Sequence, residues 1–122
     1  YVERSRGLGD VYMRQDILIV HGDTVTTYSS ALSGFYLKIP IAHIEAGLRT
    51  DNIYSPFPEE MNRRLNTKLS TFHFTPTQHS QQNLYNEGIS KDKSLVTGNT
   101  GIDSLLLGLS IIKSNKDLDK KK

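Results

Sequence analysis

Three carboxylates, Asp23, Glu45 and Glu59, are the side chains in this sequence that are best placed for chemistry. Asp23 and Glu45 each come just after a short apolar run, and Glu59 lies where a helical pattern begins. When carboxylates gather in one closed cleft, desolvation and their mutual repulsion raise their pKa values. They then take up and release protons near neutral pH. The residue types therefore predict general acid–base catalysis, provided that the fold brings the three acids together.

Each acid also has a purely structural explanation. Asp23 precedes a predicted helix, whose first turn it is able to cap. Glu45 follows an apolar run, where an ionised side chain is costly unless it is paired, and a salt bridge to Arg49 would provide the partner. Carboxylates in a first helical turn are favoured by the helix dipole, and two pairs have the spacing of surface ion pairs: Glu59–Arg63 and Glu60–Arg64. Of the three acids, Glu45 is the hardest to explain by structure alone.

The elements that must position these acids are predicted from alternating apolar runs and helical patterns. Strands are expected at 16–21, 39–44, 71–75 and 94–97, and helices at 24–38, from 58 to 69, at 77–87 and from 100 onward. Strands and helices that alternate with short connections predict a parallel sheet, covered by helices on both faces, with right-handed crossovers. The predicted fold class is therefore α/β with a Rossmann-like sheet, although no glycine-rich phosphate-binding motif is present.

Two of the predicted helices show apolar stripes. In the helix at 24–38 the stripe consists of Tyr28, Leu32, Phe35 and Tyr36. The helix that begins at Pro58, a residue favoured at the first helical position, repeats an apolar side chain every four residues, and its buried face is expected to consist of Met61, Leu65 and Leu69.

The predicted topology places the acids at one edge of the sheet. Ligands of open parallel sheets bind at the carboxyl ends of the strands, and Asp23 and Glu45 follow two successive strands. Glu59 opens the next helix after a long connection at 45–57, a kind of loop that is often functional. We therefore expect the three carboxylates to face a common crevice.

Composition excludes several other classes of protein. A chain of 122 residues with 36% hydrophobic residues buries one core of modest size, and no apolar run approaches the length of a membrane span. The absence of cysteine excludes disulfides and thiolate chemistry, and a cytoplasmic location is expected. The four histidines lack the spacing of metal ligands, so structural hydrogen bonds and no bound metal are expected for His21, His43, His73 and His79.

The small positive charge does not indicate a nucleic-acid surface. The net charge is +2, but the segment Lys113–Lys122 holds five lysines against two aspartates and leaves the rest of the chain at −1. No aromatic residues alternate with these lysines, as they would on a surface that stacks bases. We interpret 113–122 as a Lys-rich polar tail and 1–112 as one partial domain.

Several motifs together carry a family resemblance. They are Val20-His-Gly-Asp-Thr24, His43-Ile-Glu-Ala-Gly-Leu-Arg-Thr50, Tyr54-Ser-Pro-Phe-Pro-Glu-Glu60 with Asn62-Arg63, His73-Phe-Thr-Pro-Thr77 and Thr97-Gly-Asn-Thr100. In this order they resemble the non-hydrolysing UDP-N-acetylglucosamine 2-epimerases over residues 16 to about 107. The resemblance implies a fold of two Rossmann-like domains of the GT-B type, of which this chain would be the later part of the first. A chain that begins at Tyr1 and lacks the second domain is expected to be an inactive fragment of a homodimeric enzyme.

The same resemblance implies an activity. Members interconvert UDP-N-acetylglucosamine and UDP-N-acetylmannosamine without a redox cofactor, by eliminating UDP and adding it back. By motif, Asp23, Glu45 and Glu59 would be the acid–base residues, and Arg63 would bind the UDP-sugar. Glu59 or Arg63 would serve the second site at which substrate activates bacterial members. Two alternatives stay open. One is a hydrolysing epimerase, whose sequences diverge around residues 43–50, and the other is a truncated, non-catalytic α/β chain.

Overall fold

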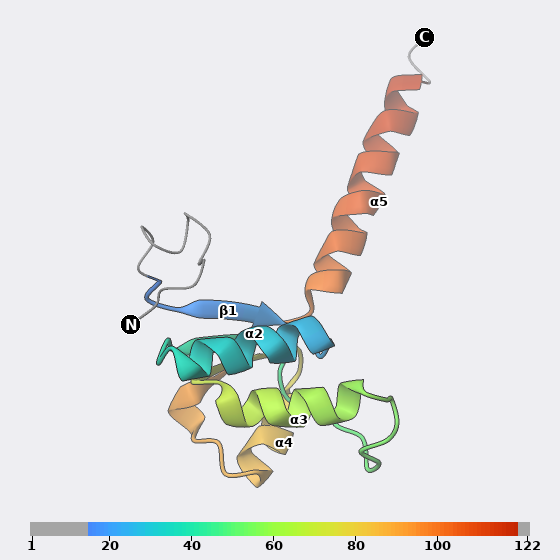
Figure 1. Cartoon of the computed structure of the whole chain (residues 1–122). Helices are drawn as coiled ribbons and strands as arrows, with labels where there is room; N and C mark the ends of the chain where they lie inside the picture. The colour runs from blue at the N-terminus through green and yellow to red at the C-terminus, as the bar shows by residue number, and fades with distance from the viewer. Residues whose placement is uncertain (1–14, 120–122) are drawn as a thin grey trace.

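The computed structural model describes residues 15–119 and has the predicted alternation of strands and helices (Figure 1). The elements are β1 (Leu18–His21), α2 (Val25–Tyr36), β2 (Ile41–Ile44), α3 (Glu59–Leu69), β3 (Phe72–Thr75), α4 (Gln78–Asn86), the 3-10 turn η1 (Lys91–Lys93), β4 (Ser94–Val96) and α5 (Thr100–Asp119). The four strands are parallel and lie side by side in the order β1-β2-β3-β4. The predicted Rossmann-like α/β class is confirmed.

The expectation that helices cover both faces of the sheet is wrong for the described residues. Parallel strands that follow one another in one direction, with crossovers of the same hand, place every connecting helix on the same side, and α2, α3 and α4 lie on one side of the sheet (Figure 1). The strand register puts Val20, His43 and His73 in one row, whereas Ile19 points to the opposite face. Ile19 on β1 is 61% exposed and Leu95 on β4 is 60% exposed, so the outer strands of that opposite face are open in the part of the chain described.

The helix α2 packs through small side chains and not through its predicted stripe. Its buried residues are Thr27, Ala31 and Gly34, whereas Phe35 and Tyr36 are exposed. A Cβ atom at Gly34 would lie 2.7 Å from the side chain of Leu18, which shows how closely α2 approaches β1. The close approach selects small residues at the contact, so of the predicted stripe Tyr28 and Leu32 are partly buried and Phe35 and Tyr36 lie outside it.

The predicted buried face of α3 is also wrong. Its fully or nearly fully buried residues are polar (Glu60, Asn62, Asn66 and Thr67), and both Met61 and Leu65 are 38% exposed. Only Leu69 of the predicted set packs against the apolar core. Pro58 is the N-cap of the helix and not its first residue. Because α3 faces the loops beyond the strands as well as the sheet, its buried side meets polar groups that need partners.

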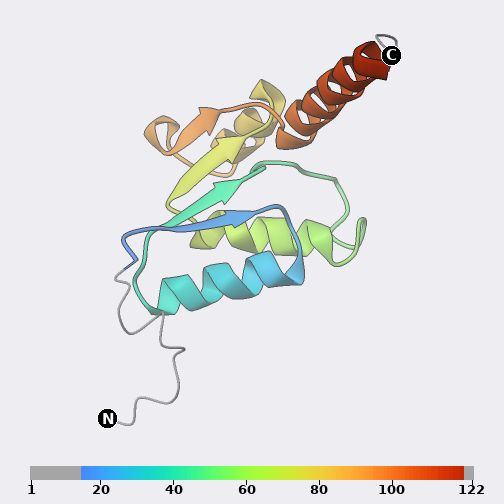
Figure 2. The ribbon, with the colours of Figure 1, turned by 90° about the horizontal axis from the view of Figure 1, so that it is seen from above.

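The helix α5 extends away from the sheet (Figures 1 and 2). The apolar residues expected on this helix are more than 40% exposed, namely Ile102, Leu105, Leu106 and Leu109. The helix continues past the boundary expected at residue 112, as far as Asp119. Among the described residues, no helix combines the length and the hydropathy that a membrane span needs.

Acid is expected to destabilise the fold through His73, which is 1% exposed. Burial is the main cause that lowers the pKa of His73 from 6.5 to about 4, and the nearby positive charge of Arg49 adds to it. As the pH falls below 6.5 the unfolded chain binds a proton at this residue, whereas the folded protein does not until about pH 4. The stability that neutral His73 supports is therefore complete above pH 6.5 and is lost between pH 6.5 and 4.

His73→Asn should accordingly flatten the pH dependence in this window by about 1.4 kcal/mol per pH unit, the value for one proton. The measurement is urea unfolding of the complete protein across the window. His79→Asn, at an exposed position on α4, is the matched control and should leave the slope as it is. Equal slopes in the unmodified protein and His73→Asn would contradict the argument.

Candidate active site

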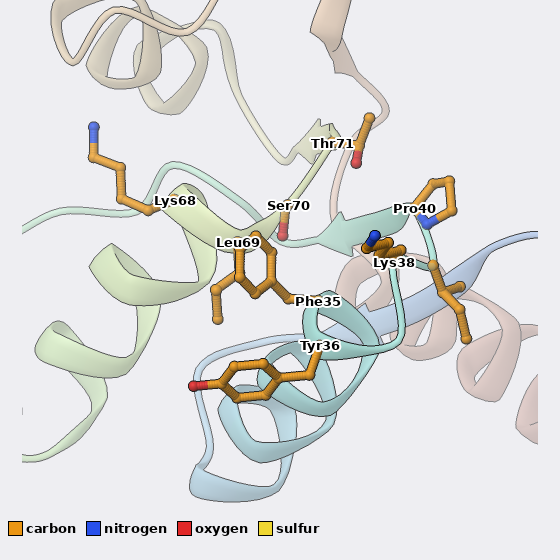
Figure 3. Close-up of a pocket in the computed structure, with 9 residues that line it drawn as sticks. Phe35, Tyr36, Lys38, Pro40, Lys68, Leu69, Ser70 and Thr71 are labelled. Atoms are coloured by element: carbon orange, nitrogen blue, oxygen red, sulfur yellow. The ribbon is translucent and has the colours of Figure 1, made fainter.

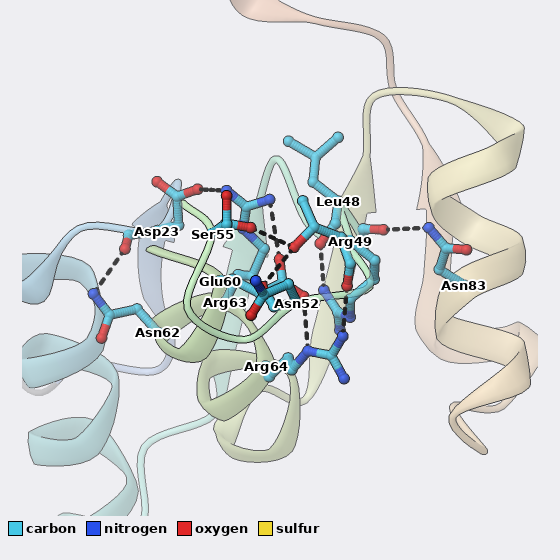
Figure 4. Close-up of polar contacts among 12 residues, drawn as sticks. Asp23, Leu48, Arg49, Asn52, Ser55, Glu60, Asn62, Arg63, Arg64 and Asn83 are labelled. Atoms are coloured by element: carbon cyan, nitrogen blue, oxygen red, sulfur yellow. Dashed lines mark hydrogen bonds and ion pairs between the residues drawn. The ribbon is translucent and has the colours of Figure 1, made fainter. Parts of the chain in front are cut away.

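Asp23 lies in the turn between β1 and α2, just beyond the carboxyl end of β1. It does not cap α2, because the N-cap is Thr24, whose hydroxyl accepts a hydrogen bond from the main-chain N–H of Thr27. Instead the Asp23 carboxylate accepts a hydrogen bond from Nη2 of Arg63. Its main-chain carbonyl accepts a second bond, of 3.0 Å, from Nδ2 of Asn62 (Figure 4). The capping explanation for Asp23 is therefore wrong, and α3 holds this residue at two points.

Glu45 follows β2 directly and lies at the same edge of the sheet as Asp23. Its Oε2 lies 3.3 Å from Nε2 of His21, at the end of β1, and 3.6 Å from the position that a Cβ atom would take at Gly22. The carboxylate thus lies over the turn that carries Asp23. The expected edge for both acids is confirmed by the parallel pairing of β1 with β2.

The backbone of Glu45 has a φ of +67°, in the left-handed region that costs a non-glycine residue about 1 kcal/mol. Such strain is retained where the surrounding structure requires it, and it is often found at functional sites. The predicted salt bridge to Arg49 is absent, because Arg49 pairs with Glu87 on the far side of the loop. Glu45 is therefore a part-exposed carboxylate at the carboxyl edge, and among the described residues the one basic side chain within 4 Å of its oxygens is His21.

Glu59 is the first residue of α3 and is partly buried. The expected surface pair with Arg63 is not formed, since the Arg63 guanidinium contacts Asp23 and, at 3.4 Å, Glu60. Arg63 lies one helical turn after Glu59 and touches Asp23, so the amino end of α3 faces the carboxyl edge of the sheet. The structure thus brings Asp23 and Glu45 together and places Glu59 on the helix that holds Asp23.

Glu60, for which the sequence predicts a surface ion pair with Arg64, belongs to this region. It is fully buried, and its carboxylate lies 2.7 Å from Nε of Arg64 and 3.4 Å from Arg63. Arg64 also donates to the carbonyl of Thr50 at 2.8 Å and so ties the long loop to α3. Two acids, Asp23 and Glu60, therefore alternate with two arginines in one neutral cluster (Figure 4). The i, i+3 and i, i+4 spacing of Glu60 from both arginines is the sequence signal for it.

A second ion pair fixes the loop that follows Glu45. Arg49 donates from Nε and Nη2 to both carboxylate oxygens of Glu87, at 2.6 and 3.0 Å, and Nη2 also donates to Thr67 at 2.8 Å. These hydrogen bonds lower the pKa of the Glu87 carboxyl group. Asn83 donates to the carbonyl of Gly47 at 3.0 Å. The loop is thereby attached to both α3 and α4, which determines the direction in which Glu45 leaves β2.

His43 supports the same edge from within the sheet. Its Nε2 donates to the carbonyl of Gly22 at 2.7 Å, and the ring is fully buried. Burial is the main cause of its lowered pKa, so the ring is neutral with its proton on Nε2. This is the structural hydrogen-bonding role predicted for the histidines.

A groove of about 620 Å³ lies at the other edge of the sheet (Figure 3). Pro40 and Thr71, which precede β2 and β3, line it together with Phe35, Tyr36 and two lysines, Lys38 and Lys68. None of the three candidate acids lines this groove. The described residues contain no group of three histidine, aspartate or glutamate side chains suited to a metal ion. The chemistry that this arrangement supports is proton transfer by carboxylates at the carboxyl edge.

The sequence is similar to a family of known proteins. Residues 8–122 match a family described as UDP-N-acetylglucosamine 2-epimerase. A relative of that name from Neisseria meningitidis is 56% identical over 100 residues, which cover 82% of this chain and 27% of the relative. One from Yersinia pestis is 49% identical and covers 86% of this chain and 28% of the relative. The chain thus spans about a quarter of the length of these proteins.

Solved structures show the same similarity. The UDP-GlcNAc 2-epimerase from Neisseria meningitidis bound to UDP-GlcNAc superposes with a TM-score of 0.76 at 55% identity, over 83% of this chain and 28% of the other. The enzyme from Methanocaldococcus jannaschii in complex with UDP-GlcNAc and UDP gives a TM-score of 0.76 at 42% identity, over 84% and 28%. The fold and the sequence therefore point to the same group of proteins.

Proposed function

This chain belongs to the UDP-N-acetylglucosamine 2-epimerase family, and from that we propose that the complete protein containing it interconverts UDP-N-acetylglucosamine and UDP-N-acetylmannosamine. The observation that carries the proposal is the placement of Asp23 and Glu45 beyond adjacent parallel strands, with α3 holding Asp23. This edge, at the carboxyl ends of the strands, is the usual position of a ligand site in open α/β sheets, and polar groups converge there. The proposal concerns the whole protein, because the chain covers about a quarter of its relatives.

The proposed reaction proceeds by elimination and re-addition. A carboxylate removes the proton from C2 of the sugar, the C1–O bond breaks with its electrons going to UDP, and a double bond forms between C1 and C2. A carboxylic acid then protonates C2 on the opposite face, and UDP adds back at C1. No electron acceptor is needed, so the proposal includes no redox cofactor and no metal.

We assign the acid and base roles to Asp23, Glu45 and Glu59. Asp23 and Glu45 lie at one edge, and an acid on each side of a sugar ring is what inversion at C2 requires. Arg63, whose guanidinium contacts Asp23, is proposed as a substrate-binding residue, because a guanidinium at this edge has several N–H donors for the oxygens of a UDP-sugar. The pair of Glu45 with His21 keeps the carboxylate at the surface of the turn.

The proposal also covers the second domain, the oligomeric state, the location and the partners of the complete protein. A second Rossmann-like domain would close the cleft over these acids, in a homodimer located in the cytoplasm. The one small-molecule partner proposed is the UDP-sugar, and nucleic acid has no part in the function. Without the second domain, we expect the 122 residues alone to produce no epimer.

The test is to incubate the complete protein with UDP-N-acetylglucosamine in D₂O and to follow the sugar by proton NMR. We expect the mannosamine epimer to appear, with deuterium at C2 of both UDP-sugars, because the proton returned to C2 comes from solvent. Release of free N-acetylmannosamine and UDP would instead assign the hydrolysing reaction. Recovery of unchanged substrate without deuterium would refute the proposal.

A further inference from the structure

The turn that carries Asp23 is held at two successive carbonyl groups by donors from two different elements. Nδ2 of Asn62, on α3, donates to the Asp23 carbonyl at 3.0 Å, and Nε2 of His43, on β2, donates to the Gly22 carbonyl at 2.7 Å. Asn62 is 7% exposed and His43 is fully buried, so water does not readily replace either donor. The peptide planes on both sides of the Asp23 Cα atom are therefore fixed.

We propose that Asn62 is a positioning residue for Asp23, an inference that rests on the proposed epimerase function. The neighbouring residue on α3, Arg63, holds the Asp23 carboxylate. Asn62 holds the main chain of the same residue, so α3 determines both where Asp23 lies and where its carboxylate points. Since misplacement of a reacting group by about 1 Å costs on the order of 10²-fold in rate, loss of the main-chain contact should reduce turnover.

The buried face of α3 offers an internal comparison. Asn66 lies one turn after Asn62, is fully buried, and neither its Nδ2 nor its Oδ1 has a hydrogen-bond partner among the described residues. Asn62 and Asn66 thus share residue type, helix face and burial, and differ in that Asn62 reaches the turn of Asp23. A purely structural role for buried amides on this face would make the two residues equivalent.

The experiment compares Asn62→Ala, Asn62→Asp and Asn66→Ala in the complete protein. Asn62→Ala should lower kcat about 10- to 100-fold with little change in the KM for UDP-N-acetylglucosamine, because the contact orients a reacting group and does not touch substrate. Asn62→Asp keeps the shape of the side chain but turns an oxygen toward the Asp23 carbonyl, so it should lose at least as much. Asn62→Asp also tests the proposal if Asn62→Ala fails to fold. Asn66→Ala should keep its kcat, and equal losses of kcat at positions 62 and 66 would overturn the proposal.

Amide hydrogen exchange provides a readout that does not depend on turnover. The segment Gly22–Tyr28 contains hydrogen-bonded amides at Gly22, Thr27 and Tyr28. The exchange rate of this segment should rise in Asn62→Ala and stay unchanged in Asn66→Ala. If the unmodified protein makes no epimer, the proposed function fails, and exchange still decides whether Asn62 positions the turn. If epimer forms but Asn62→Ala matches Asn66→Ala in both kcat and exchange, the positioning role alone is refuted.

Discussion

Replacing Glu45 with glutamine in the complete protein is expected to lower kcat by about 10²- to 10⁴-fold, the usual contribution of a general acid or base. The amide retains the size of the carboxylate and the same backbone preferences at a φ of +67°, but it cannot accept a proton. The structure removes the competing explanation, since Arg49 pairs with Glu87 and not with Glu45. The contact that is lost, with His21, is part-exposed and so contributes about 1 kcal/mol or less to stability.

The melting temperature and the affinity for UDP should therefore change little in Glu45→Gln, and kcat is the quantity that falls. All three are best measured on one preparation. Asp51→Asn is the matched control, because it removes an exposed carboxylate from the same loop and should leave kcat near normal. A Glu45→Gln protein with unimpaired kcat would end the catalytic assignment, and one that only melts earlier would show a structural role.

Gly47→Ala is expected to cost about 4 kcal/mol of folding free energy, a value at the upper end for single substitutions. A Cβ atom at this position would lie 2.2 Å from the carbonyl oxygen of Ser80 and 3.1 Å from the side chain of Leu84. Both neighbours are buried, and the oxygen is part of the α4 backbone, so it cannot move aside as a flexible side chain would. The φ of +85° adds the cost of a left-handed alanine.

Gly88→Ala separates the steric cost of an added Cβ atom from the cost of a left-handed backbone. Gly88 has a φ of +88° but no atom within 4 Å of an added Cβ, so only the backbone cost of about 1 kcal/mol applies. Urea unfolding of the complete protein gives both values. A Gly47→Ala variant no less stable than Gly88→Ala would show that α4 moves away from the loop without cost. The loss predicted for Gly47 is relevant to the site, because the loop between Glu45 and Arg49 is held against α4 at this point.

Much of the fold follows from local patterns in the sequence. The β-branched runs at 16–21 and 39–44 became β1 and β2, because chain direction and a short helical connection leave a parallel pair as the simplest arrangement. The same rule predicts from the sequence that Asp23 and Glu45 lie at one edge. Gly88 ended α4 as expected, since its left-handed conformation terminates a helix at little cost.

The faces of the helices did not follow from those patterns. Apolar periodicity indicated Met61 and Leu65 as the buried side of α3, whereas Glu60 and Asn62 occupy it. Periodicity assumes that a buried face is apolar, and that assumption fails where a helix packs over loops whose carbonyl groups and arginines need partners. The errors at α3 thus fall beside the candidate site, where polar groups are concentrated.

The sequence by itself determined the order of the strands and helices, the edge at which the acids lie and the family to which the motifs belong, because each of these depends on residues close together in the chain. The local pair Glu60–Arg64 also formed as its spacing predicts, although it is buried. Only the tertiary structure decided which charges pair over long distances in the chain. Asp23 and Arg63 are 40 residues apart, and Arg49 and Glu87 are 38 apart. From the sequence, an acid close by in the chain is the expected partner of an arginine, as Glu59 is for Arg63. Which partner a guanidinium reaches depends on how α3 and α4 pack over the strand ends, and that packing is a property of the folded chain alone.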